Sequence, residues 1–206
     1  MGKVVVDMSM SLDGFIAGVN DSQKEPLGEG GAVLQQWLFN GQLESRHSSF
    51  FKMNPISREV FDKSVDSTGA ILTGRRTYNV VGGWEGNHPA GVSVVILTHR
   101  PPIAPPEGNT PISFVTDGVE RAVREAKEKA GGKNVGVAGA RTAQQCLAAG
   151  LVDELHIHHI PVLLGEGTRL FTSLSERIPL TVKETVSDRD VTHVLYSVER
   201  VCVAYD

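Results

Sequence analysis

Residues 71–78, Ile-Leu-Thr-Gly-Arg-Arg-Thr-Tyr, join an apolar run to a basic one through a single glycine. The apolar residues before Gly74 are typical of a short buried strand, and the pattern after it predicts a short helix over residues 75–81. The same order recurs where a strand over 134–138 leads through Gly139 into a second helix. A strand that passes directly into a helix is the repeating unit of a parallel sheet, so this stretch predicts an α/β fold.

The rest of the chain extends this pattern in both directions. Hydrophobic periodicity predicts strands over residues 3–10, 92–98, 112–116, 154–164, 180–187 and 192–204, and helices over 33–38, 55–65, 117–130 and 141–149. The last three strands follow one another without a helix, which favours an antiparallel edge. No composition break marks a domain boundary, so we expect one α/β domain over residues 1–206, with a mostly parallel sheet flanked by helices.

For two of the predicted helices the sequence indicates further details. The helix over 55–65 is amphipathic, and we expect it to bury an apolar face made of Ile56, Val60, Phe61 and Val65. Asp117 is a candidate N-cap for the helix that follows it, because an aspartate oxygen there can accept a hydrogen bond from a free backbone amide. Residues 19–31 are polar and rich in glycine, so we interpret them as a mobile loop.

Composition and charge narrow the function classes. The 206 residues contain 20 Lys or Arg and 24 Asp or Glu, which gives a net charge of −4. A general nucleic-acid binder is normally strongly basic, so nucleic acid is not an expected partner. No apolar run approaches the roughly 18 residues that span a bilayer, and no basic leader precedes an apolar segment. We therefore expect a cytoplasmic protein without a membrane partner.

Polar residues follow the predicted strands at one edge of the sheet. Ligands of open parallel sheets bind outside the carboxyl ends of the strands, and helix N-termini located there favour anions. Four arginines of this acidic protein, together with two helix starts preceded by glycine, predict a site for a ligand with several phosphates. The residues concerned are Gly74, Arg75, Arg76, Thr77, Thr98, His99, Arg100, Gly139, Ala140, Arg141 and Thr142.

Two observations indicate which phosphate ligand this is. The sequence contains neither G-x-x-x-x-G-K-[ST] nor a G-x-G-x-x-G after the first strand, which argues against an NTPase and against the usual dinucleotide fingerprint. Thr98, His99 and Arg100 suit an adenosine 2′-phosphate. Charge complementarity therefore favours NADPH over NADH.

Several residues near the predicted site have two interpretations each. Asp13, the only acid in the apolar loop after the first strand, is a candidate catalytic group that orients or protonates a substrate, or a turn cap before Gly14. Trp37 either walls the substrate pocket or packs in the core. Gly165 and Gly167 belong to a tight turn, to the cofactor wall, or to both.

Three histidines in the strand over 154–164 do not predict a metal site. Strand alternation places His156 and His158 on one face and His159 on the other. No acidic or cysteine ligand accompanies them at ligand spacing, so we expect no bound metal.

Four stretches together resemble a known family. They are VVVDMSMSLDGFIAG at 4–18, ILTGRRTY at 71–78, the join at 97–100, and VAGARTAQQCLAAGLVDELHIHHIPVLLGEGTRLF at 137–171. In this order they resemble the dihydrofolate-reductase-like superfamily, and more closely the branch related to the C-terminal reductase domain of the bifunctional riboflavin-biosynthesis deaminase/reductase. The resemblance covers nearly the whole chain.

This resemblance implies a dihydrofolate-reductase-like fold with an eight-stranded sheet that binds NADPH in an extended conformation. It implies that Arg75, Arg76 and Thr77 lie at the cofactor phosphates, 98–100 near the 2′-phosphate and 139–142 at the pyrophosphate. The first loop, through Ser9, Ile16 and Ala17, would flank the nicotinamide, where apolar residues keep the hydride-transfer contact dry. Residues 20–54 would then be a lid-like insertion on the substrate side.

The resemblance also implies an activity. The expected function is that of an NADPH-dependent oxidoreductase like 5-amino-6-(5-phosphoribosylamino)uracil reductase, acting on a small-molecule substrate of the ribosylaminopyrimidine type. Reduction of dihydrofolate or a pterin is the second alternative, but Glu59, the candidate pterin-binding acid before Phe61, is not in a convincing register. No H-x-E with P-C-x-x-C deaminase signature is present.

Two further alternatives concern catalysis and assembly. The chain would then be a non-catalytic NADP-binding module, which acts as a sensor through the same basic edge. The apolar terminal strands and the segment 155–161 favour a homodimer, chiefly by analogy of fold.

Overall fold

The predicted strands and helices form with small shifts at their ends. The computed structural model describes residues 2–172, 174 and 176–199. The strands are β1 (Val4–Ser11), β2 (Phe15–Ala17), β3 (Leu43–Glu44), β4 (Lys52–Met53), β5 (Thr68–Gly74), β6 (Ser93–Leu97), β7 (Ile112–Val115), β8 (Asn134–Ala138), β9 (Glu154–Ile160), β10 (Thr168–Arg169), β11 (Leu180–Asp188) and β12 (Val191–Val198). The α-helices are α1 (Pro55–Ser67), α2 (Arg75–Val80), α3 (Val119–Lys129) and α4 (Ala140–Ala148), and the 3₁₀ helices are η1 (Gly31–Leu38) and η2 (Gly82–Gly86).

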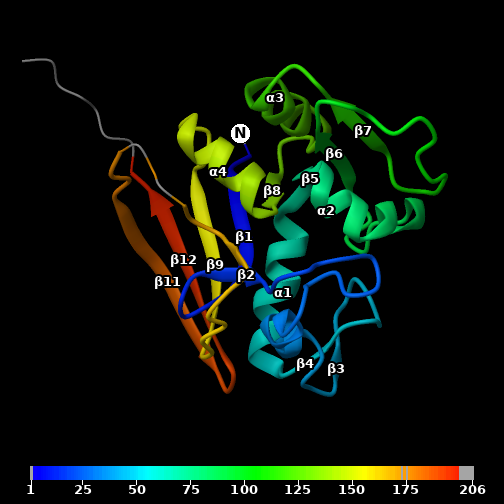
Figure 1. Cartoon of the computed structure of the whole chain (residues 1–206). Helices are drawn as coiled ribbons and strands as arrows, with labels where there is room; N and C mark the ends of the chain where they lie inside the picture. The colour runs from blue at the N-terminus through cyan, green and yellow to red at the C-terminus, as the bar shows by residue number, and fades with distance from the viewer. Residues whose placement is uncertain (1, 173, 175, 200–206) are drawn as a thin grey trace, which may run out of the picture.

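One large sheet organises the molecule. Its eight strands have the order β11-β12-β9-β1-β8-β5-β6-β7. The strands from β9 to β7 in this order run parallel, whereas β12 pairs antiparallel with β9, and β11 with β12. Figure 1 shows the β11–β12 hairpin at one edge and β6 and β7 at the other. The mostly parallel sheet with an antiparallel C-terminal edge is confirmed, while residues 200–204 of the last predicted strand lie outside the described residues.

The central strand β1 separates two different environments. Val4 and Val6 are fully buried in the core that β1 shares with α3 and α4, where small residues such as Ala126 and Ala143 let the helices pack closely. Because side chains alternate across a strand, Asp7 points to the opposite face, which α1 covers. One face of the sheet is therefore dry and apolar, and the other carries polar groups.

Helix α1 covers the polar face. It begins at Pro55, which suits the first turn of a helix. Its buried residues are Ser57 and Asp62, while Ile56 is 46% exposed, so the expected buried apolar face is wrong in part. The other three residues of that face are partly buried and line two cavities: Val60, Phe61 and Val65. Helix α1 has 13 residues, and no helix in the described part of the chain is long and apolar enough to cross a membrane.

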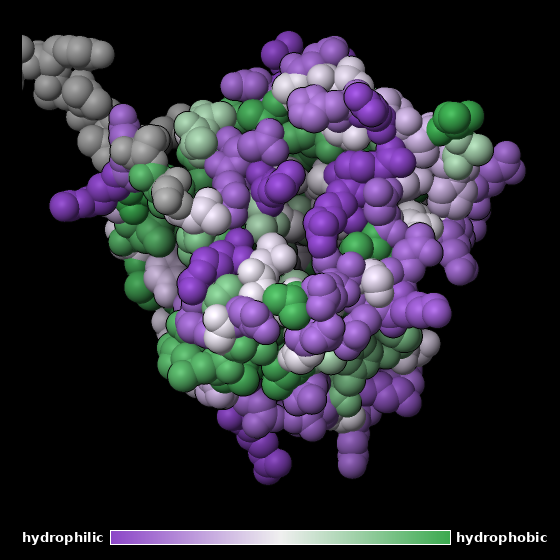
Figure 2. All heavy atoms as spheres, in the orientation of Figure 1, coloured by the Kyte–Doolittle hydropathy of each residue, from purple (hydrophilic) through white to green (hydrophobic). Residues whose placement is uncertain are grey.

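Residues 20–54 contain more structure than the loop and α-helix predicted for them. The buried residues Gly31, Leu34 and Trp37 of η1 recur at every third position, which is the 3₁₀ period, so the predicted helix is more tightly wound. A short β3–β4 hairpin follows. Phe39 and Phe50 remain largely exposed, and Figure 2 shows hydrophobic residues gathered over this part of the surface. Mobility of residues 19–31 stays a prediction.

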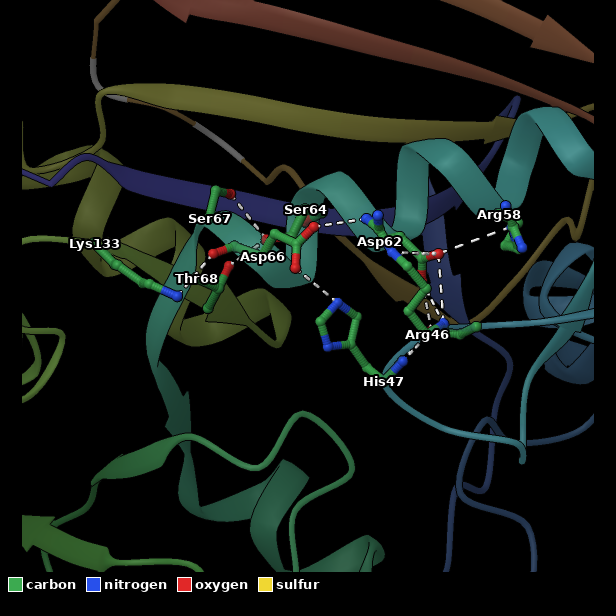
Figure 3. Close-up of polar contacts among 10 residues, drawn as sticks. Arg46, His47, Arg58, Asp62, Ser64, Asp66, Ser67, Thr68 and Lys133 are labelled. Carbon is green, nitrogen blue, oxygen red and sulfur yellow. Dashed lines mark hydrogen bonds and ion pairs between the residues drawn. The ribbon is translucent and has the colours of Figure 1, made fainter.

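Two aspartates of α1 anchor this segment. The buried Asp62 carboxylate accepts hydrogen bonds from Ser45 Oγ at 2.6 Å and from the Arg46 amide at 3.2 Å, and it also pairs with the Arg46 guanidinium at 3.3 Å. The more exposed Asp66 pairs with Arg46 at 2.7 Å and with His47 at 2.9 Å. Figure 3 shows both carboxylates pointing from α1 toward Arg46 and His47. The segment is thus held by polar contacts at one point of the helix.

Two local predictions differ from the structure. The apolar loop after β1 contains β2, which pairs with β10, so Phe15 and Ile16 are buried, whereas Leu12 is 72% exposed. Asp117 is not the N-cap of α3, because Gly118 occupies that position without a side-chain cap. The Asp117 carboxylate instead accepts a hydrogen bond from Thr116 Oγ1 at 3.0 Å.

The two anchoring aspartates differ in burial, which predicts a difference in stability. Replacing buried Asp62 with Ala leaves the buried Ser45 hydroxyl without this acceptor and is expected to lower the free energy of unfolding by about 1–3 kcal/mol. The matched change Asp66→Ala removes a half-exposed ion pair and is expected to cost about 0–1 kcal/mol. Urea unfolding of both variants measures the difference. Equal losses would contradict the anchoring role of Asp62.

Candidate functional site

A cleft of about 1580 Å³ opens where the parallel strands end. Its size exceeds that of pockets for single small ligands, which is roughly 300–1,000 Å³. Its walls come from the ends of β1, β5, β6 and β8, the starts of α2 and α4, and residues 20–54. The predicted cofactor residues that line it are Ser9, Ile16, Ala17, Gly74, Arg75, Arg76, Thr77, Thr98, His99, Arg100, Gly139, Ala140, Arg141 and Thr142.

Two arginines stand at the start of α2. Arg75 donates from Nη1 to the backbone oxygen of Arg100 at 2.6 Å and from Nε to Asn79 Oδ1 at 2.7 Å. Arg75 therefore ties the end of β5 to the end of β6. Arg76 forms two hydrogen bonds with the Asp21 carboxylate of the 20–54 segment, one of them from Nε at 2.9 Å. The Arg76 guanidinium is exposed and already holds an anionic group.

The turn after β6 presents a second basic group. Thr98 is buried, and its hydroxyl lies 3.2 Å from both the amide and the carbonyl oxygen of Arg100, which fixes the turn. The His99 and Arg100 side chains are exposed at the edge of the cleft. Within the described part of the chain, the Arg100 guanidinium forms no hydrogen bond or ion pair, so it can approach a phosphate directly.

The join between β8 and α4 lies against the join between β5 and α2. Gly139 precedes α4 with φ of 87°, a conformation that favours glycine. A Cβ at Gly139 would lie 2.6 Å from Thr77 Oγ1, and a Cβ at Gly74 would lie 2.9 Å from Thr142 Oγ1. The two glycines therefore allow the close approach that brings both helix starts to one wall of the cleft.

The opposite wall is largely apolar. Ile16 and Ala17 of β2 are buried, and Ser9 Oγ accepts a hydrogen bond from the Trp37 indole at 2.9 Å. Trp37 is 5% exposed and also lines the cleft, and its role beside a substrate stays a prediction. Its ring lies 4.8 Å from the ring of His158. This wall thus places apolar and aromatic side chains beside Ser9.

Asp13 does not line the cleft, and its carboxylate is occupied by structural hydrogen bonds. Oδ1 accepts from Ser11 Oγ at 2.6 Å and from the Leu164 amide at 3.1 Å, and Oδ2 accepts from the Gly165 amide at 2.7 Å. The hydrogen bond from Ser11, followed by those from the two amides, lowers the pKa of Asp13 to about 2. At neutral pH this carboxylate has no proton to give. The geometry favours a cap on the 163–166 turn over the expected catalytic role.

Three other expected site residues also lie outside the cleft. Glu59 is exposed on α1 and is not among the lining residues. Gly165 faces open space, and Gly167 packs against β2, where a Cβ would lie 2.1 Å from the Ala17 oxygen. Both glycines therefore belong to the turn, and Gly167 allows the turn to approach the β2 backbone closely.

Sequence reasoning missed Asp7. Residue pairing between β1 and β9 places Asp7 opposite His156, so a carboxylate does accompany the histidines and the expected absence of an acidic partner is wrong. Asp7 lies 2.9 Å from His158 Nε2 and 3.3 Å from His156 Nδ1, and it accepts from Ser64 Oγ at 2.6 Å. The signal in the sequence was a single acid that directly follows the β-branched run at 4–6 within a predicted buried strand.

The charge on Asp7 is set by the two histidines. Burial raises the pKa of Asp7, but the charge of His158 and the hydrogen bonds from His156 and His158 outweigh burial and hold the pKa well below its usual value. Burial lowers the pKa of His156, yet its hydrogen bond and charge interaction with Asp7 raise it overall. Burial lowers the pKa of His158. The two imidazoles beside the Asp7 carboxylate thus have pKa values shifted in opposite directions.

Comparisons with known proteins agree with this fold. The family model described as the RibD C-terminal domain matches residues 2–194. A crystal structure of a provisionally assigned riboflavin biosynthesis protein from Shewanella sp. PV-4 is similar with a TM-score of 0.71 and 21% sequence identity, over 96% of this chain and 99% of that chain. At this identity the likeness concerns the fold alone. No curated protein matches the sequence.

Because the two helix starts are in close contact, adding a methyl group at Gly139 is expected to lower the stability of the fold. Gly139→Ala adds a Cβ 2.6 Å from Thr77 Oγ1 in a backbone conformation with φ of 87°. Its matched control is Gly150→Ala, at φ of 63° with no atom within 4 Å of the new Cβ. The control is expected to cost about 1–2 kcal/mol from backbone strain, and Gly139→Ala is expected to cost more. Thermal unfolding measures both, and equal costs would show that the two joins are not in close contact.

Proposed function

Since the chain belongs to the RibD C-terminal domain family, we propose that it is an NADPH-dependent reductase of a ribosylaminopyrimidine, as in riboflavin biosynthesis. The observation that carries the proposal is the cleft, in which arginines stand at the ends of β5 and β6 and a dry wall stands opposite. Family membership supports a reductase that uses a nicotinamide cofactor. The choice of NADPH and of the acceptor is our own inference.

The donor set of the cleft fits a dinucleotide with three phosphates. Arg75, Arg76 and Arg100 supply guanidinium groups, and the start of α4 supplies free backbone amides with a favourable helix dipole. In this assignment Arg100, with Thr98 and His99, binds the adenosine 2′-phosphate. The residues 139–142 hold the pyrophosphate, and Arg76 exchanges its Asp21 partner for a cofactor phosphate.

The apolar wall fits the nicotinamide. When bound, NADPH would supply the hydride. Ser9, Ile16 and Ala17 would hold the ring in one orientation, and Trp37 would exclude water from the contact between ring and acceptor. Residues 20–54 contribute Asp21 and Trp37 to the cleft wall, so we propose that this segment is a lid over the substrate side.

The acceptor fits the space beside Ser9 and Asp7. A ribosylaminopyrimidine offers amide and amine groups that can hydrogen-bond with a buried carboxylate, and Asp7 is such a group in the cleft. Reduction of a pterin is the second candidate, and the exposed position of Glu59 weakens it because the acid expected for pterin binding is outside the cleft. A non-catalytic NADP-binding module is the third.

The enzyme proposal is tested by binding and by turnover. Fluorescence titration is expected to give micromolar or tighter NADPH binding, and NADPH is expected to be oxidised with 5-amino-6-(5-phosphoribosylamino)uracil. Arg100→Ala is expected to weaken NADPH binding by about 1–3 kcal/mol, the scale of a hydrogen bond to a charged group, and to leave NADH binding nearly unchanged.

Control variants separate the arginine roles. Arg124→Ala on the exposed face of α3 lies outside the cleft and is expected to leave both affinities unchanged. Arg75→Ala is expected to weaken both cofactors, because Arg75 holds the backbone of Arg100. Failure to bind NADPH would reject the proposed enzyme. Binding of NADPH without its oxidation by any pyrimidine or pterin tested would favour the non-catalytic module. Equal loss of affinity for NADPH and NADH in Arg100→Ala would reject the role of Arg100 at the 2′-phosphate.

We also propose a homodimer formed along the free edge of β11. Among the described residues β11 pairs with β12 alone, and its Leu180 and Val182 side chains are 43% and 57% exposed. Light scattering after size-exclusion chromatography is expected to give twice the mass of 22.2 kDa. Val182→Lys is expected to shift the mass toward the monomer, because charge on an edge strand opposes pairing. Lys183→Ser on the same strand is the control, and a monomeric wild-type chain would reject the dimer.

A further inference from the structure

A line of contacting side chains runs from the cleft to the β11–β12 turn. Asp7 Oδ1 lies 2.9 Å from His158 Nε2, and His158 Nδ1 lies 2.8 Å from His193 Nδ1. His193 Nε2 lies 3.2 Å from Ser57 Oγ, which is 2.6 Å from Asp188 Oδ2. The five residues come from β1, β9, β12, α1 and β11. Asp7 and His158 line the cleft, whereas Asp188 is partly exposed at the opposite end of the line.

The charge of Asp7 fixes the direction of the hydrogen bonds. An ionised carboxylate only accepts, so His158 must donate from Nε2 to Asp7. A neutral His158 then accepts at Nδ1, and His193 must donate from its own Nδ1. Burial lowers the pKa of His158 and lowers that of His193 to about 3, which keeps both rings neutral at pH 7. The hydrogen bonds between the rings therefore all point toward the cleft.

The line of five side chains contains one proton fewer than its contacts can hold. Its four contacts need one proton each, while neutral His158, neutral His193 and the Ser57 hydroxyl supply three between them. The Ser57 proton belongs in the 2.6 Å contact with ionised Asp188, which leaves the 3.2 Å contact with His193 without one. The longest contact of the line is thus the one that lacks a proton.

The middle of the line is shielded from water. His158 and His193 are 4% and 1% exposed. The Trp37 ring lies 4.8 Å from the His158 ring and 5.0 Å from the His193 ring. Between the two rings a proton therefore passes from one side chain to the next.

We propose that Asp188, Ser57, His193 and His158 form a relay that delivers a proton to Asp7, which donates it to the acceptor during reduction. The proposal rests on the proposed function, because hydride transfer leaves an acceptor atom that must be protonated. Asp7 keeps the proton only briefly, since its carboxylate is strongly acidic.

Each proton and the hydride in the proposed transfer have a defined donor and acceptor. As the acceptor takes the hydride from the nicotinamide, it takes a proton from Asp7, and Asp7 takes the Nε2 proton of His158. His158 takes the Nδ1 proton of His193 at its own Nδ1, and His193 takes the hydroxyl proton of Ser57 at Nε2. Ser57 regains a proton through Asp188 from solvent. Reversal of the two ring tautomers before the next turnover restores the starting state. The net change is one hydride and one proton added to the acceptor.

A second cavity offers a rival route. It has a volume of about 230 Å³ and is lined in part by Asp7, His156 and His193, beneath Lys63 and Glu184. Water held by the polar groups of this cavity could protonate Asp7 without the line of histidines. The two routes differ in whether His193 is needed for turnover.

Kinetics of the full-length chain decide between them, with NADPH and 5-amino-6-(5-phosphoribosylamino)uracil as substrates. Asp7→Asn is expected to lower kcat about 100-fold, the low end of general acid catalysis. His193→Gln is expected to lower kcat at least tenfold, with the KM of the acceptor and the Kd of NADPH within twofold of wild type. Its solvent deuterium isotope effect on kcat is expected to exceed that of wild type, because proton transfer becomes slower. A merely structural role would not raise this isotope effect.

The matched control is His159→Gln. His159 neighbours His158 on β9 but bonds Tyr196 and lies outside both cavities, so wild-type kinetics are expected. Wild-type kcat and isotope effect in His193→Gln would overturn the relay and leave the reductase standing. A wild-type chain that does not oxidise NADPH with this acceptor would instead overturn the proposed function, and the relay with it. Turnover that stops with a chelator would also overturn the relay, since ligand atoms of Asp7, His156 and His158 lie within 4.8 Å of one another.

Nitrogen-15 NMR tests the hydrogen-bond direction without turnover and without a variant that must fold. The wild-type chain at pH 7 is expected to show neutral His158 protonated at Nε2 and neutral His193 protonated at Nδ1. The opposite tautomers, or an imidazolium at either position, would overturn the relay as written. Asp7→Asn is expected to change the tautomer balance of His158, whereas His159→Gln is expected to leave it unchanged.

Discussion

The alternation of side chains along β1 is the constraint on which the rest of the structure depends. β1 lies inside the sheet between β8 and β9, so both of its faces are covered. Val4 and Val6 face α3 and α4 and complete an apolar core, whereas Asp7 and Ser9 face α1 and the cleft. A shift of one residue in strand pairing would bury the carboxylate in the core and place valines in the cleft. Register and function are therefore fixed together.

The polar face explains the unusual character of α1. A helix that covered an ordinary core would bury apolar residues, but α1 buries Ser57 and Asp62 and leaves cavities beside its apolar side chains. Ser57 meets the histidines of the sheet, and Asp62 holds residues 20–54 in front of the cleft. Burial of these polar groups is compensated because each has partners close enough to replace water. The helix thus serves the site more than the core.

The elements of the fold follow closely from local sequence, and so does the phosphate side of the candidate site. Residues 71–78 and 134–142 carry their strand, glycine and helix signals within one short stretch, because backbone preference and burial act locally there. The side chains that follow parallel strands must meet at one edge, so the arginines could be placed before the structure was known. The winding of η1, the β3–β4 hairpin, the β2–β10 pair, the buried face of α1 and the cap of α3 differed from the prediction. The β2–β10 pair and the buried face of α1 depend on contacts between residues far apart in the sequence.

The sequence by itself therefore determined the order of strands and helices, the family and the basic edge of the cleft. Tertiary structure alone decided which acid faces the cleft. Asp7 meets His158 across 151 positions of sequence, and Asp13 meets Gly165 across 152, yet one pairing lies at the cleft and the other at a turn outside it. Sequence spacing cannot separate these two outcomes. The register between β1 and β9 and the path of the loop that follows each strand set where a carboxylate points, and these arise only when the whole sheet is assembled.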